Sequence, residues 1–167
     1  PFDETPQELL KVQHRAYGIS FFADPSIVTT TEYDRDRRWV RTLLHDLKLP
    51  EATPKALTDR SIRDRYGDPG SLVNTLDETG HSIAKQDGDW IYRIGAGASP
   101  KGNLPFIDRQ NLKTLETDRL WRCDEGNYDS VVAIVKSSDS DKPVIITNSE
   151  TPTTPPNYFQ RALNGQS

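Results

Sequence analysis

Large apolar side chains occupy every second position of residues 90–94, where Trp90, Tyr92 and Ile94 alternate with other residues. A period of two residues is typical of a β-strand, because successive side chains point to opposite faces of a sheet. We expect this strand to have one buried face. The three large residues should then pack into the interface with a neighbouring sheet.

Two further strands are predicted directly after this run. Residues 95–103 are rich in glycine, serine and proline, which predicts a loop. The β-prone runs 106–109 and 115–123 follow, joined by a turn at 110–114. Three consecutive strands joined by turns form a meander.

The chain before this meander predicts a similar set of strands. Runs of β-branched and aromatic residues, separated by turn-forming residues, predict strands over residues 18–23, 26–32, 39–44 and 55–58. A charged turn is expected at 34–38 and a long polar connection at 61–71. Residues 5–12 fit a helix with Thr5 as its cap equally well as an outer strand.

The order of strands then repeats, which decides the predicted fold class. A second copy starts at a strand over 72–76 and continues through the meander, and a third copy has strands over 131–135, 144–147 and 157–163. Units of four strands that recur every ~40–50 residues or more are typical of β-propeller blades. An open β-sandwich is the alternative, but it does not require the order to restart. We therefore predict an all-β chain of about two and a half to three four-stranded blades.

A propeller closes with roughly four to eight blades, so we expect this chain to be a piece of one propeller domain in a longer protein. The expected boundaries are a blade remnant at 1–14, blades at 15–61 and 72–124, and a partial blade at 128–167.

Two motifs in sequence order carry a family resemblance. Asp68-Pro69-Gly70-Ser71 is followed by Gly-x-Gly-Ala-Ser-Pro-x-Gly-Asn-x-Pro-Phe over residues 95–106. This order resembles the propeller domain of serine peptidases of the prolyl oligopeptidase family, in particular the glutamyl endopeptidase branch known from chloroplasts and bacteria. Other segments that fit the same branch are 18–21, 59–61, 128–133 and 149–159. The resemblance also implies a strand over residues 8–12.

The resemblance implies how the work is divided in such enzymes. An α/β-hydrolase domain supplies the Ser, Asp and His that cut the peptide, and the propeller covers that site and helps to select the peptides that enter. The chain has no Gly-x-Ser-x-Gly elbow for a nucleophilic serine, and Pro100 directly after Ser99 removes a backbone N–H there. We expect the hydrolase domain to lie outside this chain, and the chain alone to have no catalytic residue.

Composition excludes several other classes. The chain has 167 residues, a net charge of −4 and 28% charged residues, so no basic excess favours nucleic acid or an anionic membrane. The single cysteine, Cys123, excludes an internal disulfide framework. The sequence does not distinguish between bacterial cytoplasm, bacterial periplasm and plastid as the compartment of the protein.

No metal or cofactor site is predicted. The three histidines are not spaced as ligands, and the aspartate-containing turns lack the glycine and distal glutamate of calcium loops. One basic cluster, Arg35, Arg37 and Arg38, is a candidate substrate or interface contact. It fits a solvated turn. It also fits a surface that faces a channel or domain interface and attracts acidic peptide.

Two classes of function follow. In the first, the chain is the non-catalytic propeller part of a serine endopeptidase, with peptide substrate, the remaining blades and the hydrolase domain as partners. In the second, it is a stand-alone propeller-type scaffold for a protein or carbohydrate partner. A hydrolase domain encoded after Ser167 would favour the first. Because incomplete rings expose blade faces, self-association is a further expectation.

Overall fold

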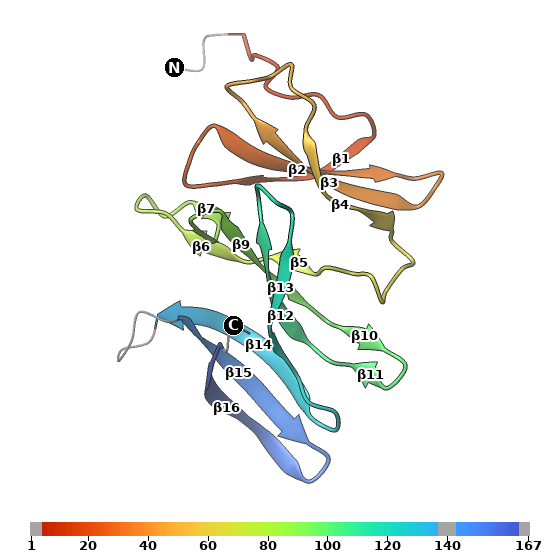
Figure 1. Cartoon of the computed structure of the whole chain (residues 1–167), viewed down its shortest axis with the longest axis vertical. Helices are drawn as coiled ribbons and strands as arrows, with labels where there is room; N and C mark the ends of the chain where they lie inside the picture. Colours follow the sequence, from red (N-terminus) through yellow and green to blue (C-terminus); the bar gives the residue numbers. More distant parts are fainter. Residues whose placement is uncertain (1–4, 137–142, 164–167) are drawn as a thin grey trace. The chain divides into compact units, whose positions relative to one another are not determined.

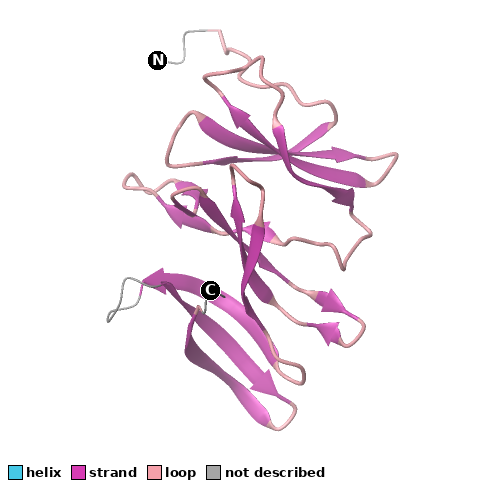
Figure 2. Ribbon diagram, in the orientation of Figure 1, coloured by secondary structure: helices cyan, strands magenta, loops and turns pink. Residues whose placement is uncertain are grey.

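A computed structural model describes residues 5–136 and 143–163 of the chain (Figures 1 and 2). These residues form strands, turns and loops, with no helix among them. A helix that could span a membrane is accordingly absent from the described part. The chain divides into two compact units, Pro1–Arg63 and Asp64–Ser167, called unit 1 and unit 2 below.

Unit 1 contains one antiparallel meander with the strand order β1-β2-β3-β4. Its strands are β1 (Arg15–Phe21), β2 (Ile27–Asp34), β3 (Trp39–Asp46) and β4 (Lys55–Ser61). Four strands were predicted in these places from β-branched and aromatic runs. The strand that the resemblance implied at residues 8–12 is not observed, and neither is a helix. The backbone N–H groups that follow, at Gln13 and His14, donate to the Glu32 carboxylate.

The described part of unit 2 contains two meanders and two short hairpins. The first has the order β13-β12-β9-β5, with β8 also paired to β9, and the second has the order β14-β15-β16. The first consists of β5 (Ser71–Leu72), β8 (Gln86–Asp87), β9 (Trp90–Gly95), β12 (Phe106–Asn111) and β13 (Thr117–Arg122). The second consists of β14 (Tyr128–Lys136), β15 (Pro143–Thr151) and β16 (Thr154–Ala162). These sequential antiparallel sheets confirm the predicted all-β class of blade-type meanders. The proposed boundaries of the blades stay a prediction.

Two local predictions in unit 2 are wrong. The strand expected over 72–76 breaks at Val73, because β6 (Asn74–Leu76) pairs with β7 (Ser82–Ala84) in a separate hairpin. The Asp77 carboxylate accepts the N–H groups of Thr79 and His81, which closes this hairpin locally. The loop expected over 95–103 also contains a small hairpin, formed by β10 (Ala98–Ser99) and β11 (Gly102–Asn103).

The prediction of one buried face for β9 is also wrong, because both faces are buried. Ile91, Tyr92 and Arg93 are 0%, 5% and 4% exposed. On one face, Tyr92 packs in an apolar cluster that joins the two meanders of unit 2, and Ile94 packs against that cluster. The Trp90 ring instead lies under the Arg109 guanidinium, whose central carbon is 4.2 Å from the centroid of that ring. The other face of β9 carries Arg93, and this buried charge positions the site described below.

Candidate functional site

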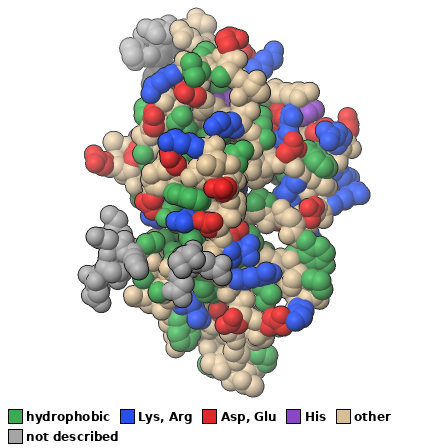
Figure 3. Space-filling model, viewed as in Figure 1, with side chains coloured by type: hydrophobic (Ala, Val, Ile, Leu, Met, Phe, Trp, Pro, Cys, Tyr) green, Lys and Arg blue, Asp and Glu red, His purple; other side chains and the backbone are tan. Residues whose placement is uncertain are grey.

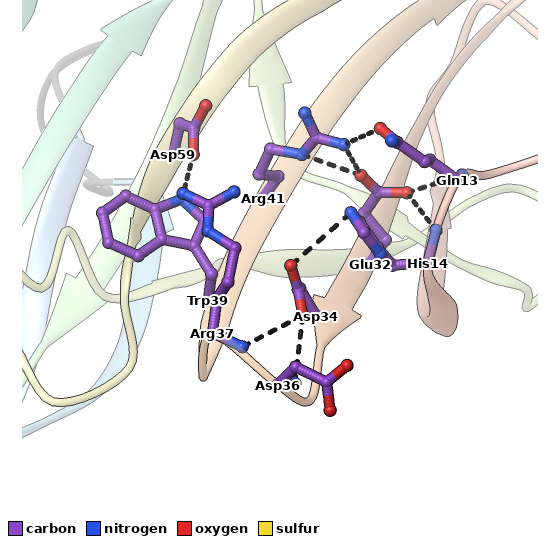
Figure 4. A network of polar contacts seen from close by, with 9 residues as sticks. All are labelled: Gln13, His14, Glu32, Asp34, Asp36, Arg37, Trp39, Arg41 and Asp59. Atoms are coloured by element: carbon purple, nitrogen blue, oxygen red, sulfur yellow. Dashed lines mark hydrogen bonds and ion pairs between the residues drawn. The ribbon is translucent and has the colours of Figure 1, made fainter.

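The charged turn between β2 and β3 is shaped by one carboxylate. Asp34 Oδ1 accepts the backbone N–H groups of Asp36 at 3.0 Å and Arg37 at 3.1 Å (Figure 4). These hydrogen bonds, that of Arg37 first, hold the pKa of Asp34 below its usual value. Arg38 closes the turn with a φ of 54°, in the left-handed region. The turn is therefore a fixed structure that ends at the start of β3.

The three arginines that the sequence singled out all lie exposed on this turn. The Arg37 guanidinium stacks 4.9 Å from the centroid of the Trp39 ring, and the Trp39 indole N–H donates to Asp59 (Figure 4). Within residues 5–136 and 143–163, neither Arg35, Arg37 nor Arg38 forms an ion pair. Their charges are available to a ligand, but only Arg37 is held by a neighbouring side chain.

A buried carboxylate lies in the same sheet, and it is fully enclosed by donors. Glu32 is 1% exposed and accepts the N–H groups of Gln13 at 2.9 Å and His14 at 3.1 Å. Its other oxygen accepts Nε of Arg41 at 2.8 Å, and also Nη2 (Figure 4). Burial raises the pKa of Glu32, but the hydrogen bonds and the Arg41 charge outweigh it and the pKa is lowered. This arrangement is structural, since no oxygen is left for a ligand.

A pocket of about 250 Å³ in unit 2 has a different character. It is lined by the loop 66–69, by residues 97–98, and by side chains of β12 and β13, namely Phe106, Asp108, Arg119 and Arg122. The two motifs of the family resemblance, residues 68–71 and 95–106, therefore meet at this pocket. The sequence analysis did not predict that they would meet.

Two glycines allow the motif segments to approach so closely. Gly70 has a φ of +77°, and a Cβ there would overlap the carbonyl of Ile94. Gly97 has a φ of +62°, and a Cβ there would overlap the carbonyl of Leu104. Because both features exclude other residues, glycine is required at Gly97 in the pocket wall and at Gly70 directly after the lining loop.

The pocket carries several charges on one face of the sheet. Asp108 lies opposite Arg93 on β9 and opposite Arg119 on β13. Arg119 donates through Nε and Nη2 to the two oxygens of Asp108, and its guanidinium lies 4.0 Å from the centroid of the Phe106 ring. Arg122 is exposed and has no ion-pair partner among the described residues.

Arg93 lies buried in the same face. Its Nε donates to Gln110 at 3.0 Å and its Nη1 to the Gly70 carbonyl at 3.3 Å, but its buried Nη2 has no hydrogen-bond partner in the described structure. Burial lowers the pKa of Arg93 to about 10, although the negative charges of Asp68 and Asp108 act to raise it. The side chain is therefore a cation at neutral pH.

A second pocket is lined by Asn103 and Pro105, by residues of β14 and β15, and by Pro156 of β16. Its volume is about 460 Å³, and its polar lining includes Tyr128, Ser130, Asn148 and Glu150. Among the described residues, no three His, Cys, Asp or Glu side chains are grouped to hold a metal ion. Cys123 is buried, and burial raises the pKa of its thiol.

Sequence reasoning found the exposed arginines but missed the charged pocket. Arg93, Asp108, Arg119 and Arg122 come from three strands, and only their register brings them to one face. The available signal was the pair of motifs at 68–71 and 95–106, whose glycines required a close approach of backbone.

The mixed charges of the molecule are visible in Figure 3, where Lys and Arg side chains are interspersed with Asp and Glu over the face shown. This agrees with the small net charge of −4. Neither a basic nor an acidic field dominates that face.

Comparison with known proteins shows which proteins the chain is related to. No family model matches it. It is 33% identical over 139 residues to a probable chloroplastic glutamyl endopeptidase of Arabidopsis thaliana, covering 79% of this chain and 14% of that protein. It is 32% identical over 167 residues to the corresponding protein of Oryza sativa subsp. japonica, covering 93% of this chain and 18% of that protein. Among solved structures, TolB from Acinetobacter baumannii has a TM-score of 0.47 at 16% identity, over 98% of this chain and 34% of that chain.

The chain thus spans less than a fifth of the length of these curated relatives. The matches cover most of its residues, including the motifs that line the pocket. They confirm the predicted resemblance: the chain is related to a segment of the glutamyl endopeptidases, a branch of the prolyl oligopeptidase family.

Proposed function

We propose that the chain is a non-catalytic propeller segment of a serine endopeptidase, and that it gates or positions peptide substrate for a hydrolase domain encoded elsewhere. One observation carries this proposal: 93% of the chain aligns with a protein named as a probable glutamyl endopeptidase. The meander sheets support it, because such sheets are the structural units of propellers.

The contacts of the chain support a role without chemistry. A nucleophile needs a general base within hydrogen-bond reach and access to the substrate. Thr30 Oγ1 lies 2.8 Å from Nε2 of His45, but Thr30 is only 6% exposed. Burial also lowers the pKa of His45. This pair is part of the sheet interior, and a peptide carbonyl cannot reach it. A second pair, Thr79 Oγ1 and His81 Nδ1, is exposed and 2.5 Å apart, but the Thr79 hydroxyl donates its proton to the Asp77 carboxylate at 2.7 Å and not to the imidazole.

The exposed arginine turn is the part of unit 1 that we propose contacts substrate. Arg35, Arg37 and Arg38 present three positive charges without ion-pair partners in the described residues, and stacking on Trp39 restrains Arg37. Exposed cations raise the rate of encounter with acidic peptides, and salt screens this effect. Such a surface would favour the acidic peptides that the name of the relatives implies.

The test uses the full-length protein that contains this segment, with Arg37→Gln compared against Lys113→Gln. Both substitutions remove one exposed positive charge, and Lys113 pairs with Asp89 in unit 2, outside the arginine turn. For an acidic peptide of ten or more residues, we expect Arg37→Gln to raise KM about two- to fivefold at low salt with kcat unchanged. A dipeptide substrate should be unaffected. Equal effects of the two substitutions, or an equal loss with the dipeptide, would contradict a gating role of the turn.

A further inference from the structure

We propose that the pocket formed by the loop 66–69, residues 97–98 and the β12–β13 face binds a carboxylate group. Nothing in the relation to peptidases assigns a ligand to this pocket, and its proposed role goes beyond gating by the arginine turn. The donors, the charge balance and the size of the pocket support this proposal.

Among the described residues, the pocket-lining arginine without an ion-pair partner is Arg122. Arg119 is not free, because its Nε and Nη2 are both used by Asp108. Arg122 lies opposite Phe106 in the β12–β13 register, and Phe106 lines the pocket beside it. A guanidinium offers two parallel N–H groups, which match the two oxygens of a carboxylate. An acceptor that enters this pocket therefore meets an unused planar donor.

On the same face of the sheet, Arg93 supplies a buried guanidinium with one unsatisfied donor. It is 4% exposed, and its Nη2 has no acceptor among the described residues. A buried cation with an unsatisfied donor is costly, and such groups call for a missing acceptor or a bound ion. Because Arg93 lies opposite Asp108, on the face that lines the pocket, its field acts on any anion bound there.

The charge balance selects the kind of anion. Three arginines, Arg93, Arg119 and Arg122, share this face with Asp108 and with Asp68 of the lining loop, so one net positive charge remains. A singly charged carboxylate neutralises it. A phosphate dianion would be repelled by the two aspartates that line the site.

Size narrows the ligand further. A volume of about 250 Å³ is smaller than the ~300–1,000 Å³ of pockets that enclose drug-sized ligands. It suits the end of a side chain or a small acid. The ion pair of Arg119 with Asp108 and its stacking on Phe106, at 4.0 Å, restrain these wall side chains, so little ordering of them is required on binding.

The experiment follows the arginine Nε–Hε signals of the 167-residue chain by NMR, at constant ionic strength set with sodium chloride. Sodium acetate and sodium glutamate should give saturable shifts of Arg119 and Arg122 at millimolar concentration, and neutral acetamide should give none. Arg122→Gln should weaken binding about tenfold, the loss expected for a charge-assisted pair. The matched control Lys113→Gln should stay within about twofold of the parent chain, since screening weakens remote charges.

Capped peptides distinguish a free acid from a peptide side chain as the source of the carboxylate. Acetyl-Ala-Glu-Ala-amide should bind, and its Gln counterpart should not. Binding of free glutamate alone would still support the carboxylate site but restrict it to small acids. Shifts that do not saturate, an Arg122→Gln affinity equal to that of Lys113→Gln, or tighter binding of phosphate than of acetate would overturn the proposal. Since none of these readouts measures peptide cleavage, their failure would leave the proposed gating function untouched.

Discussion

The buried charges of the two units are held in opposite ways. In unit 1, each oxygen of Glu32 accepts two hydrogen bonds, and the donors come from the segment before β1 and from Arg41 on β3. In unit 2, Arg93 keeps one buried nitrogen without an acceptor, and Asp129 keeps one buried oxygen without a donor, within the described residues. The same type of meander therefore satisfies both oxygens of a buried carboxylate in unit 1 and leaves buried charged groups with unsatisfied atoms in unit 2.

The difference teaches which charges belong to the fold. A buried ion is tolerated when its hydrogen bonds are complete, and each missing one costs free energy. Glu32 meets that condition, so its network ties residues 13–14 to the sheet and needs nothing further. Arg93 does not meet it, and it lies beside a pocket with a free arginine. The open site is the one with capacity for a ligand.

The largest expected effect concerns unit 2, whose stability we attribute to its apolar cluster rather than to its charges. Tyr92 is 5% exposed, and it packs with Ile107 and Ile145 from both meanders. Tyr92→Ala should lower the free energy of unfolding by about 3–5 kcal/mol, the range for losing a buried aromatic side chain. Denaturant titration measures it. The control is Tyr128→Ala, at a residue that is 66% exposed and should change stability by less than about 0.5 kcal/mol. Equal midpoints for the two variants would show that the cluster does not hold the meanders together.

A smaller effect distinguishes Glu32, whose two oxygens are both hydrogen-bonded, from Asp129, which has one oxygen without a partner in the described structure. Glu32→Gln places an amide N–H₂ against two of the four N–H groups that the carboxylate accepts, and we expect a loss of about 3 kcal/mol. Asp129→Asn is the matched change in unit 2. Its Oδ2 accepts from Arg161 at 3.3 Å, while Oδ1 has no partner in the described structure and leaves room for the amide. A loss of about 1 kcal/mol is expected there. Equal losses would remove the distinction between the two units.

The hydrogen-bonded Glu32 carboxylate also predicts how the free energy of unfolding depends on pH. The pKa of Glu32 is lowered in the folded chain, so the folded state binds this proton less readily than the unfolded state. Its stabilisation is then complete above the unfolded value of about 4.3 and is lost as the pH falls through the lower folded value. Glu32→Gln should flatten that part of the acid unfolding curve. A curve that remains as steep as that of the parent chain would assign the acid transition to other groups.

Much of the fold could be predicted from sequence, and the reasons for success and failure are physical. β3 and β14 are long runs of β-branched and aromatic residues with clear turns before them, so their positions were predicted. β6, β7 and β8 have only two or three residues each, which is too short for a periodic signal. Arg93 seemed to belong to a solvent face, because a charge that alternates with large apolar residues is typical of a half-buried strand.

The candidate site was predicted only in part for a similar reason. Arg35, Arg37 and Arg38 lie within four consecutive residues and were found as a cluster. The pocket instead depends on the registers of β9, β12 and β13 and on a bulge between Ile107 and Asp108. A shift of one residue would move its side chains to the other face. Composition and spacing do not determine that register.

The central claim, that the chain itself performs no peptide chemistry, has a direct test. The purified 167-residue chain is incubated with Glu-containing and Pro-containing fluorogenic peptides, beside the full-length protein that contains this segment. We expect background hydrolysis by the chain, because its sequence has no Gly-x-Ser-x-Gly elbow for a nucleophilic serine, and turnover by the full-length protein. Saturable turnover by the chain that survives repurification would contradict the account.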